Sequence, residues 1–314
     1  MRILIIHKIH PILEEQLLEA GYFVDTKLNL SREQTIHLLP EYQGLVVRSA
    51  LQVDHEVISA ATGLEFIARL GAGLENIDVD YARRKGMQIF SAPEGNRSAV
   101  GEQSVGMLLS LYNNLNKADA EVRQGIWQRE ENRGEEIEGK TIGIIGYGNM
   151  GSAFAQKISG FGASVIAYDK YKSKFGNDLV KEVSLAQLFD QADVISIHVP
   201  LQEDTFHLVN DNFIQSFKKD FVLINTSRGA VANTSDLVEG LKSGKIKGAC
   251  LDVLEFEGMS FENIEKQEKS TDFLYLSQAK NVVLSPHIAG WTHQSDQKMA
   301  EILATKIISY FGIN

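Results

Sequence analysis

The sequence contains few of the features that mark secreted or membrane proteins. Its 314 residues include one cysteine, Cys250, so no disulfide can form within the chain. No apolar run approaches the roughly 18 residues of a membrane-spanning helix, and the first residues do not form a secretion signal. Cys250 has apolar neighbours, which is typical of a buried strand residue and not of a nucleophile. We therefore expect a cytoplasmic protein without disulfides or membrane association.

Positive charge is also scarce. Lysine and arginine number 31 against 41 aspartates and glutamates, and this net charge of −10 argues against nucleic acids or anionic membranes as main partners. An anionic substrate would therefore need a local basic pocket. The hydrophobic fraction of 44% is that of an ordinary globular protein. The length exceeds what one hydrophobic core usually supports, so we expect two domains.

Strands and helices alternate in two series, each typical of a parallel sheet covered by helices. In the first series the expected strands are 2–6, 22–26, 44–48 and 64–70, and the expected helices are 11–20, one capped by Ser31, and 53–61. In the second series one expected strand begins at 141, and the others are 164–168, 194–197, 221–224, 249–251 and 282–284. Residues 100–127 contain few helix breakers and are expected to form one long helix between the series. The predicted fold class is α/β.

The most informative stretch is a G-x-G-x-x-G turn, formed by Gly146, Gly148 and Gly151, between an expected strand and an expected helix. Such glycines allow a tight turn, close approach of a pyrophosphate, and close packing of helix on strand. The alternative is a turn that serves packing only. Asp169 ends the next strand, 23 positions after Gly146, close to the spacing of a carboxylate that binds an adenosine ribose. This acid favours NAD over NADP, although Lys170 beside it leaves NADP open.

Polar side chains follow successive strands of the second series, at the strand ends where parallel sheets bind ligands. They lie in the segments His198-Val199-Pro200, Asn225 to Gly229, Asp252 to Glu257, and Ser285 to His287. Taken singly, Arg228 reads as a surface salt bridge, Glu257 as a solvated acid and His287 as a helix cap. Their occurrence at neighbouring strand ends predicts one shared cleft instead.

The chemistry of these three residue types is specific. A guanidinium binds a carboxylate or carbonyl oxygen through a planar fork, and an imidazole exchanges a proton near neutral pH beside a carboxylate that stabilises its charged form. Next to a nicotinamide, this set oxidises an alcohol adjacent to a carboxylate, or reduces the 2-keto acid. No G-x-S-x-G elbow and no H-E-x-x-H motif is present, which argues against serine hydrolysis and zinc chemistry. We expect no metal.

These stretches resemble the D-isomer-specific 2-hydroxyacid dehydrogenase family over nearly the whole chain. The resemblance also rests on Gly71 to Asp78, on Gly139-Lys140-Thr141 and on Pro286 to Gly290. It implies that Arg228 binds and polarises the substrate, that His287 is the acid/base, and that Glu257 keeps His287 protonated. It further implies contacts to NAD from Gly146, Gly148, Asn149, Met150, Gly151, Asp169, His198, Pro200, Thr205, Thr226, Asp252 and Gly290.

The resemblance also implies an architecture. A discontinuous substrate domain would comprise residues 1–98 and 289–314, a Rossmann domain residues 99–288, and a cleft would lie between them. The amides of Ala72 and Gly73 would bind the substrate carboxylate. Homodimers built on the long helix after Val100 are usual in the family.

The most specific expectation from the sequence concerns the substrate. Within the family, the chain resembles the D-3-phosphoglycerate dehydrogenases, which serve serine biosynthesis, at Val47-Arg48-Ser49, Asn76-Ile77-Asp78 and Asn96. Arg48 is the natural partner for the phosphate. Hydroxypyruvate and glyoxylate are alternative substrates, and an NAD-sensing binding protein is an alternative outside enzymes. The charged segment 261–280 is expected to contain a short helix at the cleft or at a subunit contact.

Overall fold

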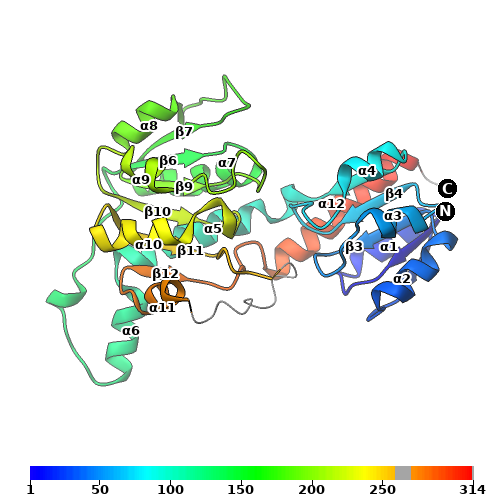
Figure 1. Cartoon of the computed structure of the whole chain (residues 1–314), viewed down its shortest axis with the longest axis horizontal. Helices are drawn as coiled ribbons and strands as arrows, with labels where there is room; N and C mark the ends of the chain where they lie inside the picture. The colour runs from blue at the N-terminus through cyan, green and yellow to red at the C-terminus, as the bar shows by residue number, and fades with distance from the viewer. Residues whose placement is uncertain (259–269, 313–314) are drawn as a thin grey trace. The chain divides into compact units, whose positions relative to one another are not determined.

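The chain folds into two α/β units in a computed structural model that describes residues 1–258 and 270–312. Among these residues, the first unit comprises 1–96 and 291–312 and the second comprises 97–258 and 270–290 (Figure 1). The limits expected from the sequence, 98 and 289, differ from these by two residues each. The described helices include none that is long and apolar enough to cross a membrane.

The first unit is built on a parallel sheet of five strands in the order β2-β1-β3-β4-β5. The strands are β1 (Arg2–Ile5), β2 (Phe23–Thr26), β3 (Gly44–Val47), β4 (Phe66–Arg69) and β5 (Gln88–Ser91). One face packs on α1 (Ile12–Glu19) and on α12 (His293–Phe311), and the other on α2 (Arg32–Leu38), α3 (His55–Ala60) and α4 (Val79–Arg84). A 3₁₀ helix, η1 (Leu39–Glu41), follows α2. The strand β5 was not expected from the sequence.

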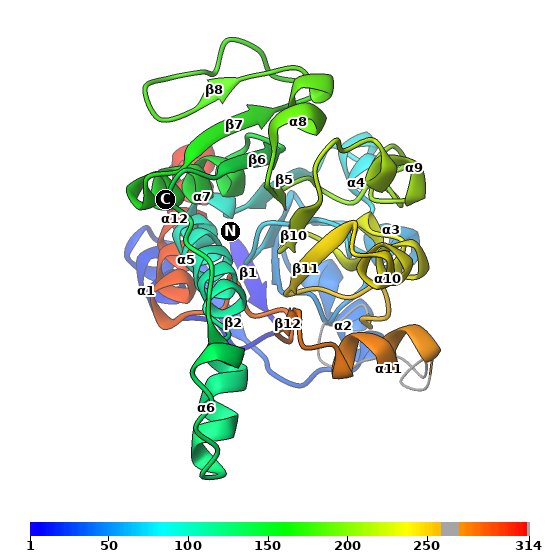
Figure 2. The same cartoon turned by 90° about the vertical axis from the view of Figure 1, so that its left-hand side faces the viewer.

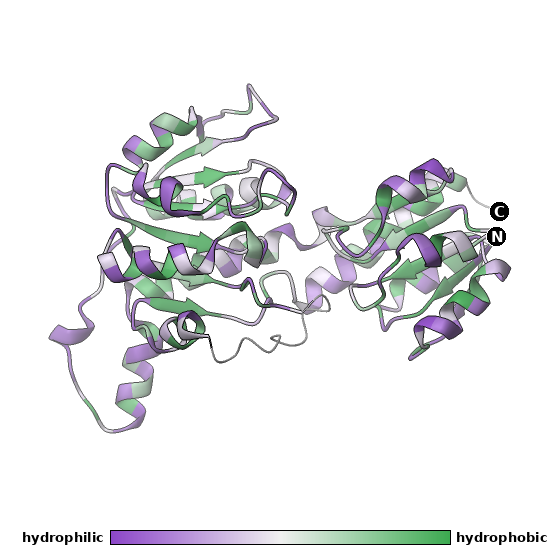
Figure 3. Ribbon diagram, in the orientation of Figure 1, coloured by the Kyte–Doolittle hydropathy of each residue, from purple (hydrophilic) through white to green (hydrophobic). Residues whose placement is uncertain are grey.

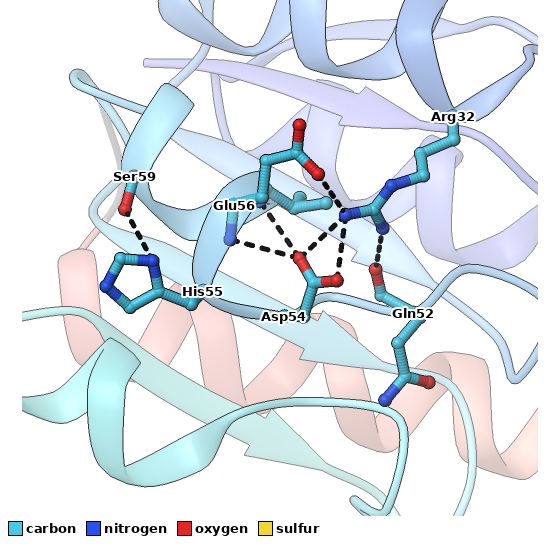
Figure 4. Close-up of polar contacts among 7 residues, drawn as sticks. Arg32, Gln52, Asp54, His55, Glu56 and Ser59 are labelled. Atoms are coloured by element: carbon cyan, nitrogen blue, oxygen red, sulfur yellow. Dashed lines mark hydrogen bonds and ion pairs between the residues drawn. The ribbon is translucent and has the colours of Figure 1, made fainter.

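Local hydrogen bonds explain where the helices of the first unit begin. Ser31 forms the predicted capping box with Gln34 at the start of α2, and Asp54 caps α3. Arg32 links these two helices, because its Nη2 lies 2.8 Å from both Asp54 carboxylate oxygens (Figure 4). The same nitrogen lies 2.8 Å from Glu56. These contacts lie on an exposed face and have a structural role.

The second unit is built on a parallel sheet of seven strands in the order β12-β11-β10-β9-β6-β7-β8. The strands are β6 (Thr141–Ile145), β7 (Ser164–Tyr168), β8 (Lys181–Glu182), β9 (Val194–Ile197), β10 (Phe221–Asn225), β11 (Ile246–Leu251) and β12 (Val282–Leu284). Their interiors are hydrophobic, and apolar clusters cover both faces (Figure 3). Cys250 is fully buried in β11, as predicted.

The described helices of the second unit are α5 (Pro93–Tyr112, which begins in the first unit), α6 (Leu115–Arg123), α7 (Asn149–Ile158), α8 (Leu185–Gln191), α9 (Asp211–Gln215), α10 (Thr234–Ser243) and α11 (Thr271–Gln278). Those other than α6 pack on these two faces. Three 3₁₀ helices are η2 (Glu130–Asn132), η3 (Ser159–Phe161) and η4 (Gly229–Val231). The helix expected within 261–280 is α11, whereas residues 259–269 lie outside the described residues.

The prediction of one long helix over 100–127 is wrong. The helix already begins at Pro93, ends at Tyr112, and is followed by a separate helix α6 that extends from the sheet of its unit (Figure 2). Asn114 makes the break, because its φ of 51° is left-handed, a conformation that asparagine tolerates better than most residues. None of the residues of α6, all of which are described, is buried.

Candidate active site

The glycine-rich turn joins β6 to α7, and a different physical reason explains why glycine occupies each of its three positions. Gly146 has a φ of +90°, which other residues rarely adopt. A Cβ on Gly151 would lie 2.0 Å from the carbonyl oxygen of Gly146, so only glycine lets α7 pack this closely on its strand. A Cβ on Gly148, by contrast, would meet no described atom within 4 Å. That open space, at a helix start without a side-chain cap, fits the approach of a pyrophosphate.

Asp169 lies at the end of β7, where the sequence placed it. Its Oδ2 accepts a hydrogen bond from the Tyr147 amide at 2.7 Å, and its Oδ1 accepts from the amides of Tyr171 and Lys172, both at 2.9 Å. The carboxylate thus fastens the glycine-rich turn to the next strand. Lys170, which left NADP open, has its ammonium 2.6 Å from Asp204. Asn149 and Met150 are the first residues of α7.

The loop after β9 holds three of the expected cofactor contacts. His198 is buried with its Nε2 at 2.8 Å from the Ser196 hydroxyl, and burial lowers its pKa to about 3, so the ring is neutral. Its Nδ1 has no hydrogen-bond partner among the described residues. The Thr205 hydroxyl donates to the Pro200 carbonyl at 2.6 Å and closes the loop. The His198 side chain is therefore buried between Ser196 and the ring of Phe154, whose centroid lies 5.4 Å from that of the imidazole.

A polar network shapes the loop after β10. The Asn225 side chain accepts from the Ser227 amide at 3.1 Å and hydroxyl at 2.8 Å, and donates to the Arg228 carbonyl at 3.0 Å. The Thr226 hydroxyl lies 3.1 Å from that of Ser104 in α5. Asn225 and Ser227 were not assigned roles from the sequence, although a polar group after a buried strand was a usable signal.

Gly229 brings the Arg228 loop against the loop after β11. A Cβ on Gly229 would lie 1.9 Å from the Leu254 carbonyl oxygen, so any other residue would push the two loops apart. Arg228 donates from Nη1 to the Ser227 carbonyl at 2.7 Å. The glycine is thus a positioning residue that the sequence analysis did not identify as such.

Asp252 organises the loop after β12. Its carboxylate, in a residue only 1% exposed, accepts from the Ser285 hydroxyl at 2.6 Å and from the amides of Ile288 at 3.0 Å and Ala289 at 2.8 Å. Its carbonyl accepts from the His287 amide at 2.7 Å. Burial raises the pKa of Asp252, and these donors oppose that effect. Asp252, predicted as a cofactor ligand, thus holds the backbone of His287 and of the two residues after it, and the side chain of Ser285 before it.

Glu257 and His287 form the expected pair. The Oε2 of Glu257 lies 2.5 Å from the Nδ1 of His287, and the two side chains are 16% and 20% exposed. His287 has a φ of 54°, an uncommon conformation for a residue other than glycine and one that clusters at functional sites. Because β10, β11 and β12 are neighbours in the sheet, their ends bring the loops of Arg228, Glu257 and His287 together.

The predicted substrate residues belong to the first unit, at the ends of β3 and β4. Arg48 is already engaged there: its Nε donates to the Lys8 carbonyl at 2.9 Å and its guanidinium forms an ion pair with Asp296. The guanidinium also lies 4.9 Å from the centre of the Trp291 ring. Ser49 follows Arg48, and Ala72 and Gly73 follow β4. Gly290 is the last residue of the second unit.

The chain is similar to known dehydrogenases over its whole length. Residues 105–289 match the D-isomer specific 2-hydroxyacid dehydrogenase, NAD binding domain. The chain is 36% identical over 289 residues to a hydroxypyruvate reductase of Thermotoga maritima, covering 92% of this chain and 91% of the relative. It is 33% identical over 311 residues to the D-3-phosphoglycerate dehydrogenase of Archaeoglobus fulgidus, of which it covers 57%. It therefore spans little more than half of that relative.

Solved structures agree with this similarity. D-2-hydroxyisocaproate dehydrogenase superposes with a TM-score of 0.85 at 27% identity, covering 99% of this chain and 96% of that one. D-lactate dehydrogenase from Aquifex aeolicus, in complex with NAD and lactic acid, gives 0.82 at 27% identity, covering 99% and 95%. The fold that they share with this chain, two α/β units each built on a parallel sheet, is the one expected from the sequence. The chain belongs to the D-isomer specific 2-hydroxyacid dehydrogenase family, a family of NAD-dependent oxidoreductases, and carries the family's NAD binding domain.

Proposed function

We propose that this protein interconverts a D-2-hydroxy acid and its 2-keto acid, with Arg228, Glu257 and His287 as the catalytic residues. The observation that carries the proposal is the 2.5 Å contact between Glu257 Oε2 and His287 Nδ1 at the strand ends that also carry the Arg228 loop. NAD, when bound, supplies the hydride acceptor. The chain's own residues supply the proton transfer and the binding of the acid.

His287 moves the proton. Because Glu257 occupies Nδ1, we assign the exchange with the substrate hydroxyl to Nε2. In oxidation the imidazole removes the hydroxyl proton, and in reduction the imidazolium returns a proton to the carbonyl oxygen. The Glu257 carboxylate stabilises the imidazolium in both directions. The loop held by Asp252 fixes the ring in place.

Arg228 binds the acid. Its guanidinium provides a fork of donors for the substrate carboxylate and for the carbonyl oxygen as negative charge develops there. We assign further carboxylate binding to the amides of Ala72 and Gly73. Gly146, Gly148 and Gly151 would hold the pyrophosphate of NAD and Asp169 its ribose, with Asn149, Met150, His198, Pro200, Thr205, Thr226, Asp252 and Gly290 completing the site.

We propose D-3-phosphoglycerate as the first candidate substrate, oxidised to 3-phosphohydroxypyruvate in serine biosynthesis. The Archaeoglobus and human D-3-phosphoglycerate dehydrogenases align with 98% of this chain, at 33% and 32% identity. Arg48 would bind the phosphate, exchanging the Asp296 carboxylate for it. This exchange requires that the ion pair between Arg48 and Asp296 be broken.

Hydroxypyruvate or glyoxylate is the second candidate, and the Arg48 ion pair favours it. A guanidinium neutralised by Asp296 attracts a phosphate less than one without a carboxylate partner. The hydroxypyruvate reductase relative is also matched over 91% of its own length. Neither of these unphosphorylated acids would need an exchange at Arg48.

A panel of 2-hydroxy and 2-keto acids, followed by NADH absorbance, tests the function. We expect NAD-dependent turnover of D-isomers only, with little use of NADP, and loss of that turnover in His287→Ala. The ranking of 3-phosphoglycerate against hydroxypyruvate and glyoxylate identifies the substrate. NADH binding without turnover of any acid would contradict the proposal and favour an NAD-sensing binding protein.

We also propose a homodimer, with α6 at the subunit contact. Val122 is 51% and Trp127 78% exposed, so large apolar groups of this region are without cover from the described residues. Light scattering on the purified protein should give twice the chain mass, and Trp127→Glu should shift it toward the monomer.

A further inference from the structure

A second histidine–glutamate pair lies beside the first. The Oε1 of Glu255, two residues before Glu257, lies 2.6 Å from the Nε2 of His207. The other oxygen of Glu255 accepts from the amide of Thr234 at 3.0 Å and from its hydroxyl at 2.7 Å. Both oxygens of the carboxylate are therefore engaged, and it binds the start of α10.

Glu255 is part of the turn that carries Glu257. The Glu257 amide donates to the Leu254 carbonyl at 3.2 Å, which closes a β-turn in which Glu255 is the second residue. The Leu254 amide in turn donates to Glu257 Oε1. The conformation of this turn therefore sets where the Glu257 carboxylate lies, and its other oxygen contacts His287.

His207 is held by its own surroundings. Its amide donates to the Ala230 carbonyl at 2.9 Å, and its ring stacks on Phe206 with 3.9 Å between centroids. Its Nδ1 lies 3.4 Å from the side-chain nitrogen Nδ2 of Asn233, so both ring nitrogens of His207 have a polar partner. Burial acts to raise the pKa of Glu255, but hydrogen bonds from Thr234 and His207 outweigh it and lower the pKa below its usual value.

We propose that Glu255, held by His207 and by the start of α10, is a positioning residue that keeps the Glu257 carboxylate on His287. The inference deepens the proposed function and rests on it. Gly229 supplies a second constraint, because a Cβ there would lie 2.5 Å from the Glu255 amide nitrogen. The turn is thus anchored on one side by the Arg228 loop and on the other by the Glu255 side chain.

The alternative is that the network only stabilises the fold, and a pH profile separates the two roles. A loosened Glu257 stabilises the imidazolium less, so the loss of 2-keto acid reduction with rising pH should move to lower pH. Asp252, a further carboxylate that interacts electrostatically with His287, is present in every variant compared. A purely structural role would lower the amount of folded enzyme without moving the profile.

The experiment compares Glu255→Ala, Glu255→Gln and His207→Asn with wild type, and uses Glu203→Gln as the control, since Glu203 is exposed and lies outside the network. We expect Glu255→Ala to lower kcat by about 10- to 100-fold, as a misplaced catalytic pair does, and to move the profile in the direction that Glu257→Gln moves it. The Kd for NADH should change less than about twofold. Glu255→Gln keeps the side chain's size, so its kcat should lie between those of wild type and Glu255→Ala. The kcat and pH profile of the control should match wild type.

A double substitution makes the test sharper. If Glu255 acts through Glu257, then Glu255→Gln added to Glu257→Gln should cost little more kcat than Glu257→Gln alone. Additive losses, or a kcat loss with an unmoved profile, would overturn the proposal. Should the wild type turn over no acid, the proposed function fails, and nitrogen NMR of the His287 ring still tests Glu255. The ring signals should then change in Glu255→Gln but not in Glu203→Gln, and unchanged signals would overturn the inference.

Discussion

Arg48 and Asp296 form an ion pair although 248 positions separate them in the chain. Arg48 follows β3 and Asp296 lies in the first turn of α12, and Trp291 stacks on the same guanidinium. The contact fastens the start of α12 to the carboxyl end of β3, the central strand of the first unit's sheet. It also means that a phosphate can reach Arg48 only in competition with a carboxylate.

This competition gives the first prediction. If 3-phosphoglycerate is the substrate, Arg48→Ala should raise its KM by about 10- to 100-fold, because charge-assisted hydrogen bonds to phosphate are lost, and leave hydroxypyruvate nearly unaffected. Asp296→Asn should lower the KM for 3-phosphoglycerate. Steady-state kinetics on both substrates measure this. Equal losses on both would mean that Arg48 binds a group common to them.

The glycine-rich turn gives a matched pair of substitutions. Gly148→Ala should leave the melting temperature almost unchanged, since its Cβ meets no described atom within 4 Å, but should weaken NADH binding by about tenfold or more. Gly151→Ala should lower the melting temperature, because its Cβ would collide with the Gly146 carbonyl. Calorimetry and fluorescence titration distinguish them, and a Gly148→Ala variant with wild-type NADH affinity would contradict the assignment.

Asp169 should set cofactor choice. Its carboxylate would accept from the ribose hydroxyls of NAD and repel the added phosphate of NADP, so Asp169→Ala should weaken NAD binding more than NADP binding. The same variant loses the acceptor of the Tyr147 amide, so some loss with both cofactors is expected. Asp169→Asn keeps an acceptor there and serves as the comparison. A wild type that uses both cofactors equally would show the assignment to be wrong.

His198 should make the fold sensitive to acid. Its pKa is about 3 in the folded state against 6.5 for an ordinary histidine, so between these values only the unfolded chain binds the proton. Stability contributed by the neutral ring is present above 6.5 and is lost as the pH falls below it, by up to about 2 kcal/mol at pH 5. The free energy of unfolding, measured with urea, should fall less between pH 7 and pH 5 in His198→Gln than in wild type. An equal fall in both proteins would mean that the folded state accommodates the charged ring.

Sequence patterns predicted those features whose structure is determined by residues close together in the chain. The β6 turn and β7 with Asp169 could be placed because buried runs, glycines and the acid recur at a known spacing. The ends of β10, β11 and β12 were found for the same reason, since polar residues after buried strands are conspicuous. The strand order β12-β11-β10, which makes these ends neighbours, came from the structure.

Long-range partners were not predictable in this way. The Asp296 partner of Arg48, the Ser285 contact of Asp252 and the pairing of His207 with Glu255 join segments far apart in the chain. Which carboxylate meets which cation depends on how strands and helices pack, and many acids in the sequence have the same local surroundings. The break at Asn114 was missed because asparagine also occurs within helices, and its left-handed conformation was found only in the structure.

The most direct test of the proposed mechanism is the kcat of His287→Gln for reduction of the best 2-keto acid, measured together with the Kd for NADH. We expect kcat to fall by about 10²- to 10⁴-fold, because the acid/base group is lost, while the Kd stays within about twofold. Glu257→Gln should lose less kcat and should reach half activity at a lower pH. A His287→Gln enzyme with near wild-type kcat would contradict the assignment of His287 as the proton donor.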